Sequence, residues 1–313
     1  MSNPTKESAT ALQTGLNPEP PFTKASLSDV ILRSSDGVDF YVNRAVLSLV
    51  SPVFETMFSL PQTEGNSTIP VVDVQEDSEL LDRALRFFYP GTQLLLQTLD
   101  DAIEVFRVLL RKYDMQCLVP AARNHLEAYI TSSPVSVYAL ALAYQWEDIA
   151  KAAATQSLKS PVLHVKASRA LDLISGSEYQ NLLWYHRRCG AAAKATTTKM
   201  RWITFNYETW FTCDTCSYHS TRTLADASTY PCRKWFMEFL LGMGELLART
   251  PKMGIRSHRL FTKAVAEASQ CAHCRTHNPF EQLANFVSIW ENRIITEVAK
   301  VREAPRLLLN LVS

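Results

Sequence analysis

Four of the seven cysteines fall into two C-x-x-C pairs, and these residues are the best suited to chemistry in the sequence. The pairs are Cys213/Cys216 and Cys271/Cys274, with 54 residues between them. Each spacing places two thiolates on one tight turn, where both can reach a single ion. Two such turns supply four sulfur ligands, which suits tetrahedral zinc with Zn–S distances near ~2.3 Å. Because a four-sulfur shell leaves no position for water, the sequence predicts a structural zinc site and not a catalytic one.

Alternatives for this cysteine group stay open. His219, His273 and His277 lie close to a pair in the sequence, and any of them can replace a cysteine as a zinc ligand. Cys232 is a spare ligand. The four thiols could also be reduced core residues, or a redox group. A redox C-x-x-C normally follows a strand in a βαβ unit, and the pattern shows none here.

Motifs of catalysis are absent from the sequence. It contains only nine glycines and no Gly-rich phosphate loop, and neither G-x-S-x-G nor H-E-x-x-H occurs. The other histidines are scattered singly along the chain, at His125, His164, His186 and His258. The sequence therefore predicts a protein that is not an enzyme.

The N-terminal elements begin with a hairpin over residues 28–42. Val38, Phe40 and Val42 alternate with polar residues after the turn signal at Ser35-Asp36-Gly37, which indicates a strand with one buried face. Apolar residues at three- and four-residue steps predict helix over 44–58, interrupted at Ser51-Pro52. Next, the pattern predicts a third strand over residues 69–74. It then predicts three helices, over residues 76–89, from residue 100, and over residues 118–130.

Several motifs accompany this order of elements. They are Ser28-Asp29-Val30, Val42 to Leu47, Ser51 to Phe54 with Met57-Phe58, Phe88 to Gly91, and Ala102, Leu109, Lys112-Tyr113 and Met115. Together they resemble the BTB/POZ domain across residues 26–130. The resemblance implies an α+β fold, a small sheet flanked by helices. It also implies self-association as a homodimer, or docking on a cullin-type ubiquitin-ligase scaffold.

The resemblance also suggests a binding site within this domain. Asp29 and Arg44 match the Asp and the basic residue that lie in a charged, partner-facing pocket of the family; pairing within the domain is the alternative. Asn43 stands where the family usually has His. No apolar strand precedes Ser28, although some members swap such a strand to build a dimer.

The rest of the chain is expected to be mainly helical. Residues 131–198 are similar to the BACK-like helices that follow BTB domains in adaptors, and residues 199–313 form a Cys-rich helical region with the zinc clamp. A helical stretch is predicted from about Trp235 to Ala268, and another from Pro279, capped by Asn278. The region resembles the C-terminal extensions of fungal BTB-domain proteins. Residues 1–25, rich in Ser, Thr, Pro and Asn, are expected to be disordered.

Charge is distributed unevenly along the chain. Residues 1–130 hold ten Lys/Arg and 17 Asp/Glu, a net charge of −7, and residues 131–313 hold 22 and 14, a net charge of +8. One basic stretch is Arg249, Lys252, Arg256, His258, Arg259 and Lys263. These residues do not share one helical face, which favours a solvated surface over a phosphate-binding one.

These observations predict a protein–protein interaction adaptor whose BTB domain self-associates or docks on a cullin scaffold and whose helical region binds a client. The alternative is a transcription-associated regulator whose basic, zinc-bearing half contacts nucleic acid. No apolar run reaches the ~18–20 residues that span a bilayer, and no secretory signal is visible. The expected location is therefore intracellular, in the cytoplasm or the nucleus, without a membrane partner.

Overall fold

The computed structural model describes residues 18–23, 28–60, 69–92, 96–162, 168–204 and 208–302. The chain divides into two compact units, Met1–Tyr129 (unit 1) and Ile130–Ser313 (unit 2). Most of the expected disordered segment lies outside the described residues, as do His164 and the aromatic residues Phe205 and Tyr207. No helix in the described part of the chain is both long and apolar enough to cross a membrane.

Unit 1 is built on a three-stranded sheet in the order β2-β1-β3. Strands β1 (Val30–Arg33) and β2 (Asp39–Val42) are antiparallel, and β3 (Val71–Asp73) runs parallel to β1. The hairpin turns at Gly37, whose φ of 84° is a conformation that favours glycine. Strand β2 alternates as predicted, since Phe40 and Val42 are buried and Asp39 and Tyr41 are only partly so. Strand β1 does not alternate, because Val30, Ile31 and Leu32 are all buried.

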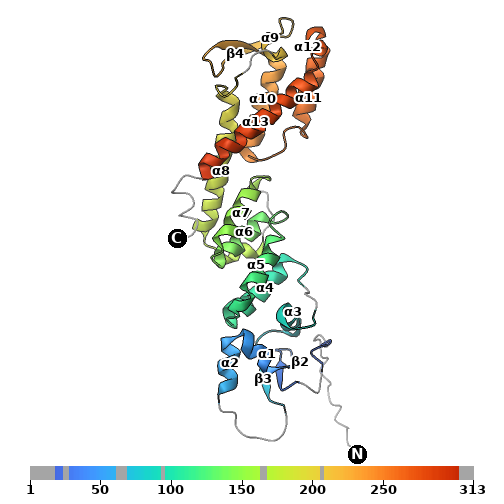
Figure 1. Cartoon of the computed structure of the whole chain (residues 1–313), viewed down its shortest axis with the longest axis vertical. Helices are drawn as coiled ribbons and strands as arrows, with labels where there is room; N and C mark the ends of the chain where they lie inside the picture. Colours follow the sequence, from blue (N-terminus) through green and yellow to red (C-terminus); the bar gives the residue numbers. More distant parts are fainter. Residues whose placement is uncertain are drawn as a thin grey trace, which may run out of the picture. The chain divides into compact units, whose positions relative to one another are not determined.

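Unit 1 also contains seven helical segments, of which α1 and α2 are drawn beside the sheet in Figure 1. They are α1 (Arg44–Val50), α2 (Pro52–Ser59), α3 (Ser78–Phe88), α4 (Leu99–Phe106), the π-helix η1 (Arg107–Lys112), the 3₁₀-helix η2 (Gln116–Leu118) and α5 (Val119–Glu127). The predicted interruption at Ser51-Pro52 separates α1 from α2. The buried Ser51 hydroxyl accepts a hydrogen bond from the Phe54 N–H and donates one to the Tyr113 carbonyl, at 2.6 Å.

Phe22 corrects the predicted start of the folded region. It was assigned to the disordered tail, yet its side chain is fully buried. Its ring lies 6.0 Å from that of Phe40 and 5.2 Å from that of Tyr89, and the Arg86 guanidinium lies 5.3 Å above it. The polar composition of the segment predicts disorder in spite of this one aromatic residue. Its side chain can be buried only once the sheet and α3 have formed.

Unit 2 is mainly helical, as the sequence predicted. Its elements are α6 (Pro134–Ala143), α7 (Glu147–Ser157), η4 (Arg169–Leu173), α8 (Gly176–Thr198), α9 (Thr209–Thr212), β4 (Tyr218–Thr223), β5 (Thr229–Arg233), α10 (Lys234–Arg249), α11 (Arg259–Gln270), α12 (Ala272–Thr276) and α13 (Pro279–Arg302). The long helix α8 packs against both α10 and α13.

Two features of unit 2 differ from the sequence prediction. The helical stretch from Trp235 to Ala268 is two helices, because α10 ends at Arg249 just before Pro251, which lacks a donor N–H and disfavours helix in the residue before it. The hairpin β4–β5 was not predicted. Its β-branched threonines were a signal for strand, but their exposure weakens the alternating pattern on which strand prediction depends.

Candidate metal centre

Cys213 and Cys216 lie in the loop between α9 and β4. The preceding turn, α9, is anchored by the fully buried Trp210, whose ring stacks on that of Phe236 with a centroid distance of 4.7 Å. Thr209 fixes the other side of α9, because its N–H and its hydroxyl donate to the Gln282 side-chain oxygen of α13 at 3.1 and 3.0 Å. Packing therefore places this pair of thiols on a rigid turn.

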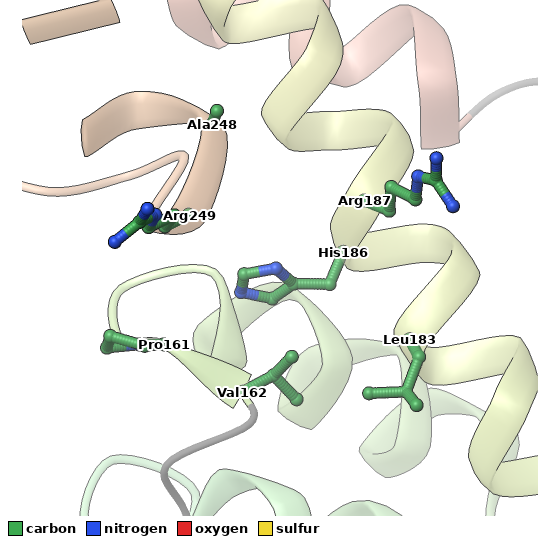
Figure 2. A pocket seen from close by; sticks show the side chains of 7 residues that line it. All are labelled: Pro161, Val162, Leu183, His186, Arg187, Ala248 and Arg249. Carbon is green, nitrogen blue, oxygen red and sulfur yellow. The ribbon is translucent and has the colours of Figure 1, made fainter. Parts of the chain in front are cut away.

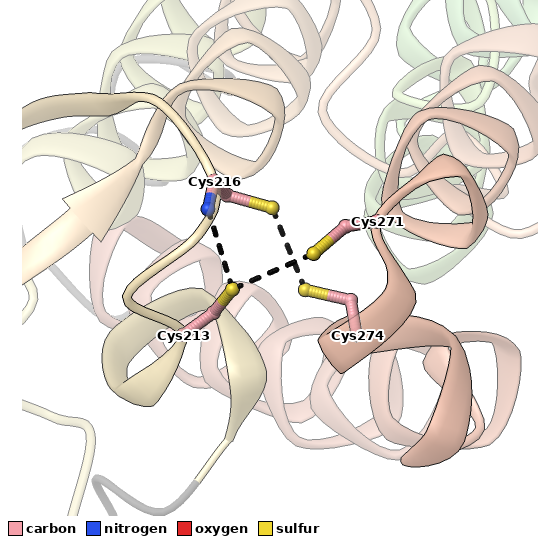
Figure 3. A group of neighbouring side chains, drawn as sticks. All are labelled: Cys213, Cys216, Cys271 and Cys274. Atoms are coloured by element: carbon pink, nitrogen blue, oxygen red, sulfur yellow. Dashed lines mark hydrogen bonds between the residues drawn. The ribbon is translucent and has the colours of Figure 1, made fainter.

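Cys271 and Cys274 lie at the corner between α11 and α12. The Cys271 N–H donates to the Ala268 carbonyl at the end of α11, and its carbonyl accepts from the Arg275 N–H in α12. Cys271 thus ends one helix and caps the next. The following turn of helix brings the Cys274 sulfur to the same side of the corner as the Cys271 sulfur (Figure 3).

The four sulfurs face one another across these two turns (Figure 3). Cys213 Sγ lies 3.7 Å from Cys271 Sγ, Cys216 Sγ lies 3.6 Å from Cys274 Sγ, and all four sulfurs are within 4.8 Å of one another. A tetrahedron with Zn–S bonds of ~2.3 Å has edges of about 3.8 Å. The sulfur spacing therefore fits a tetrahedral zinc ion. It is far longer than the ~2.05 Å of a disulfide, and all four cysteines are free.

The surroundings of the four sulfurs are unequal. Cys213 and Cys274 are fully buried, whereas Cys216 and Cys271 are partly exposed. Burial raises the pKa of the Cys216 thiol to about 11 and also raises that of Cys274. The backbone N–H of Cys274 lowers the pKa of Cys271 to about 7. A divalent cation among the sulfurs would hold all four as thiolates, so its binding releases protons and weakens as the pH falls.

The nearby histidines and the spare cysteine lie outside this group. Among the described residues, the group whose side chains lie close enough to hold one metal ion consists of the four cysteines alone. His219 is exposed and its Nδ1 lies 3.0 Å from the Ser220 hydroxyl, while the His273 and His277 rings stack on each other 4.8 Å apart. Cys232 is buried in β5 opposite Ser220. The donor set is thus four sulfurs, which suits zinc and leaves no ligand position for a substrate.

The second predicted site pairs Asp29 with Arg44 at the start of α1. The Asp29 carboxylate accepts a hydrogen bond of 2.6 Å from the Arg44 backbone N–H, and the Arg44 guanidinium lies 5.3 Å from the centroid of the Phe58 ring. Asn43 also caps α1, because its side-chain oxygen accepts from the Ala45 N–H. Asp29 therefore serves at least as a helix cap, and its carboxylate remains exposed.

Unit 1 exposes apolar side chains that the sequence pattern does not predict. Leu49 on α1 is 85% exposed, Leu60 after α2 is 59% exposed, and Val53 on α2 is exposed although its helical spacing placed it in the core. The sequence does contain one indication that Leu49 is exposed, since this residue lies off the apolar stripe of its helix. Single-sequence periodicity cannot tell such a residue from an ordinary surface leucine.

Comparison with known protein families gives a match within unit 1. Residues 19–130 match the family model of the BTB/POZ domain. The chain contains a BTB/POZ domain. This domain begins before the predicted residue 26 and includes the buried Phe22. BTB/POZ domains mediate protein–protein interaction and are not typically catalytic. No curated protein matches the chain, and the four-cysteine group lies outside the matched residues.

Proposed function

We propose that this protein is a non-enzymatic protein–protein interaction adaptor, in which the BTB/POZ domain self-associates or docks on a cullin-type ubiquitin-ligase scaffold. The observation that carries the proposal is the BTB/POZ domain at residues 19–130. Unit 2, with a BACK-like part over 131–198 and a zinc-clamped part over 199–313, recruits the client. An intracellular location and a fungal type of BTB protein belong to the same proposal.

Exposed aliphatic side chains on α1 and α2 support a protein partner for unit 1. Leu49 on α1, Val53 on α2 and Leu60 just after α2 each present apolar area to solvent. Larger exposed apolar patches are typical of interaction sites, because a partner removes them from water. The exposed carboxylate of Asp29 and the adjoining Arg44 would form the charged, partner-facing pocket beside α1.

The cysteine group would act in this adaptor as a structural zinc clamp. Zinc bound by Cys213, Cys216, Cys271 and Cys274 joins the α9–β4 loop to the α11–α12 corner. Structural zinc contributes roughly 10–16 kcal/mol of binding free energy in small peptides, enough to hold two separate segments together. The clamp would keep the client-binding surface of unit 2 in one conformation.

A binding experiment with matched variants tests the adaptor proposal. Purified full chain should retain a cullin scaffold on beads and show a dimer mass by light scattering. Leu49→Glu should weaken one or both interactions by about tenfold or more, because a desolvated carboxylate at an interface costs over 1.4 kcal/mol. Val71→Glu is the control, since Val71 is also exposed but lies in β3. Wild type that neither dimerises nor binds the scaffold would contradict the proposal.

A second candidate function rests on charge. Residues 131–313 carry a net charge of +8, which favours contact with nucleic acid. The test is binding of duplex DNA by the full chain over a range of salt concentrations. Tight binding with a steep salt dependence would replace the adaptor proposal by that of a transcription-associated regulator.

A further inference from the structure

Two adjacent cavities lie in unit 2 where the segment after α7 meets the end of α10. The first has a volume of about 480 Å³ and is lined by Pro161, Val162, Leu183, His186, Arg187 and Arg249, among others (Figure 2). The second has a volume of about 360 Å³, and its lining includes Lys159, Leu247, Pro251, Lys252, Glu291 and Ile295.

The same two chain segments border both cavities, so the cavities lie next to each other; together they are called here the α7–α10 groove. Lys159 faces one cavity and Pro161 the other, and their Cα atoms can be at most about 7.6 Å apart. The Lys252 N–H donates to the Leu158 carbonyl at 3.0 Å, which holds the two bordering segments together. A few residues of extended peptide, at ~3.3 Å per residue, would reach from one cavity to the other.

The walls of the groove are apolar. Val162 and Leu183 line the first cavity, and Ile295, which is 57% exposed, lines the second. Trp184, next to Leu183 in the sequence of α8, is 52% exposed and lies under the Arg187 guanidinium at 5.9 Å. Exposed apolar side chains beside concave surfaces are typical of sites that receive apolar side chains of a partner.

The charged residues of the groove are mainly cationic. Arg249 lies on the same side of α8 as the buried His186 ring, whereas the Arg187 guanidinium points away from that ring (Figure 2). Lys159 and Lys252 belong to the second cavity. Among the described residues that line the two cavities, Glu291 is the one carboxylate, and its side chain accepts a hydrogen bond from the Ile255 N–H. The groove thus combines apolar cavities with the basic side chains of Lys159, Arg249 and Lys252, which complements a ligand of alternating acidic and apolar character.

We propose that the α7–α10 groove binds a short acidic peptide segment of a partner protein, with apolar side chains of the peptide in the two cavities and its carboxylates near Arg249 and Lys159. The inference deepens the proposed adaptor function, on which it rests, by identifying the client-binding surface and the chemistry of the client. A nucleic acid would also meet the basic side chains, but a backbone of phosphates leaves the apolar cavities unfilled.

Selection from a random peptide display library on the purified full chain tests this inference. Enriched peptides should carry both Asp/Glu and large apolar residues, and a synthetic copy labelled with fluorescein should bind less tightly as salt is raised. Its affinity should fall about tenfold or more in Arg249→Glu and in Lys159→Glu. Arg259→Glu is the matched control, because Arg259 is exposed and lines neither cavity.

Three results would overturn the inference. They are selection without enrichment of acidic residues, equal affinity of the charge-reversed variants and wild type, and displacement of the peptide by a single-stranded DNA oligonucleotide that binds more tightly. Leu49→Glu should bind the peptide as wild type does. Peptide binding without scaffold binding would therefore reject the scaffold part of the proposed function alone, and the converse would reject only the groove.

Discussion

Individual side chains in unit 2 differ in how burial affects their ionisation. Glu208, at the start of α9, is buried, and its Oε2 has no hydrogen-bond partner among the described residues. Burial raises the pKa of its carboxyl from 4.5 to about 7. The neutral acid is therefore favoured in the folded protein, close to the turn that carries Cys213. Such a residue costs stability at neutral pH and above, where it must be buried as an anion.

The pH dependence of stability follows from this residue. The unfolded carboxyl ionises near 4.5 and the folded one near 7, so its burial destabilises the fold progressively as the pH rises between these values, and fully above them. Glu208→Gln should raise the free energy of unfolding by about 1–3 kcal/mol at pH ~8 and by less at pH ~5.5. Urea unfolding at both pH values measures this. Glu245→Gln is the exposed control, and an equal gain at both pH values would contradict the prediction.

At the scale of elements, helix α8 organises unit 2 through close contacts. Gly190 allows α8 to approach the end of α10, since a Cβ at this position would lie 2.1 Å from the Ala248 carbonyl oxygen. On another side of α8, the Trp290 indole N–H of α13 donates to the Thr196 hydroxyl at 2.7 Å. These contacts hold α10 and α13, which in turn position the aromatic residues beneath the cysteine group.

Glycine-to-alanine substitutions in α8 test the close approach. Gly190→Ala should destabilise the protein by about 1–3 kcal/mol, because the two helix backbones must move apart, although alanine favours helix by about 1 kcal/mol. Gly176→Ala is the matched control in the same helix, since nothing lies within 4 Å of its Cβ position. The measurement is the midpoint of urea unfolding. A Gly190→Ala protein as stable as Gly176→Ala would show that α8 and α10 do not pack this closely.

At the scale of the whole molecule, the two units offer separate spectroscopic signals. All six tryptophans lie in unit 2, at positions 146, 184, 202, 210, 235 and 290. Tryptophan fluorescence therefore reports unfolding of unit 2 alone, whereas far-UV circular dichroism reports both units. This difference allows the effect of metal on one unit to be observed in the intact chain.

Removal of metal should affect unit 2 selectively. Purified protein is expected to contain about one zinc per chain. A chelator should lower the fluorescence-detected melting temperature by about 10 °C or more, since structural zinc sites contribute several kcal/mol to folding. Cys213→Ser should lose the zinc, whereas Cys232→Ser, which removes a buried thiol outside the group, should keep it. Metal analysis that finds well under one zinc per chain in wild type would reject the clamp.

Local patterns of the sequence were sufficient to predict several features of the structure. Alternation over residues 38–42 and the Ser51-Pro52 step predicted the hairpin and the helix break, because strand period and proline geometry are set by neighbouring residues. The C-x-x-C spacing likewise brings the two thiols within each pair together. The order of these local elements was sufficient to indicate the BTB/POZ domain.

Only the tertiary structure decided how distant segments meet. It placed Cys213 near Cys271 and Cys216 near Cys274, across a gap that includes a hairpin and two helices, because helix packing in unit 2 determines where each turn lies. It also buried Phe22 and left Leu49 exposed. The α7–α10 groove, too, is a feature that only the tertiary structure decides. Its residues come from the segment after α7, from α8, from α10 and the loop after it, and from α13. No local pattern of the sequence shows which faces of these elements stay uncovered.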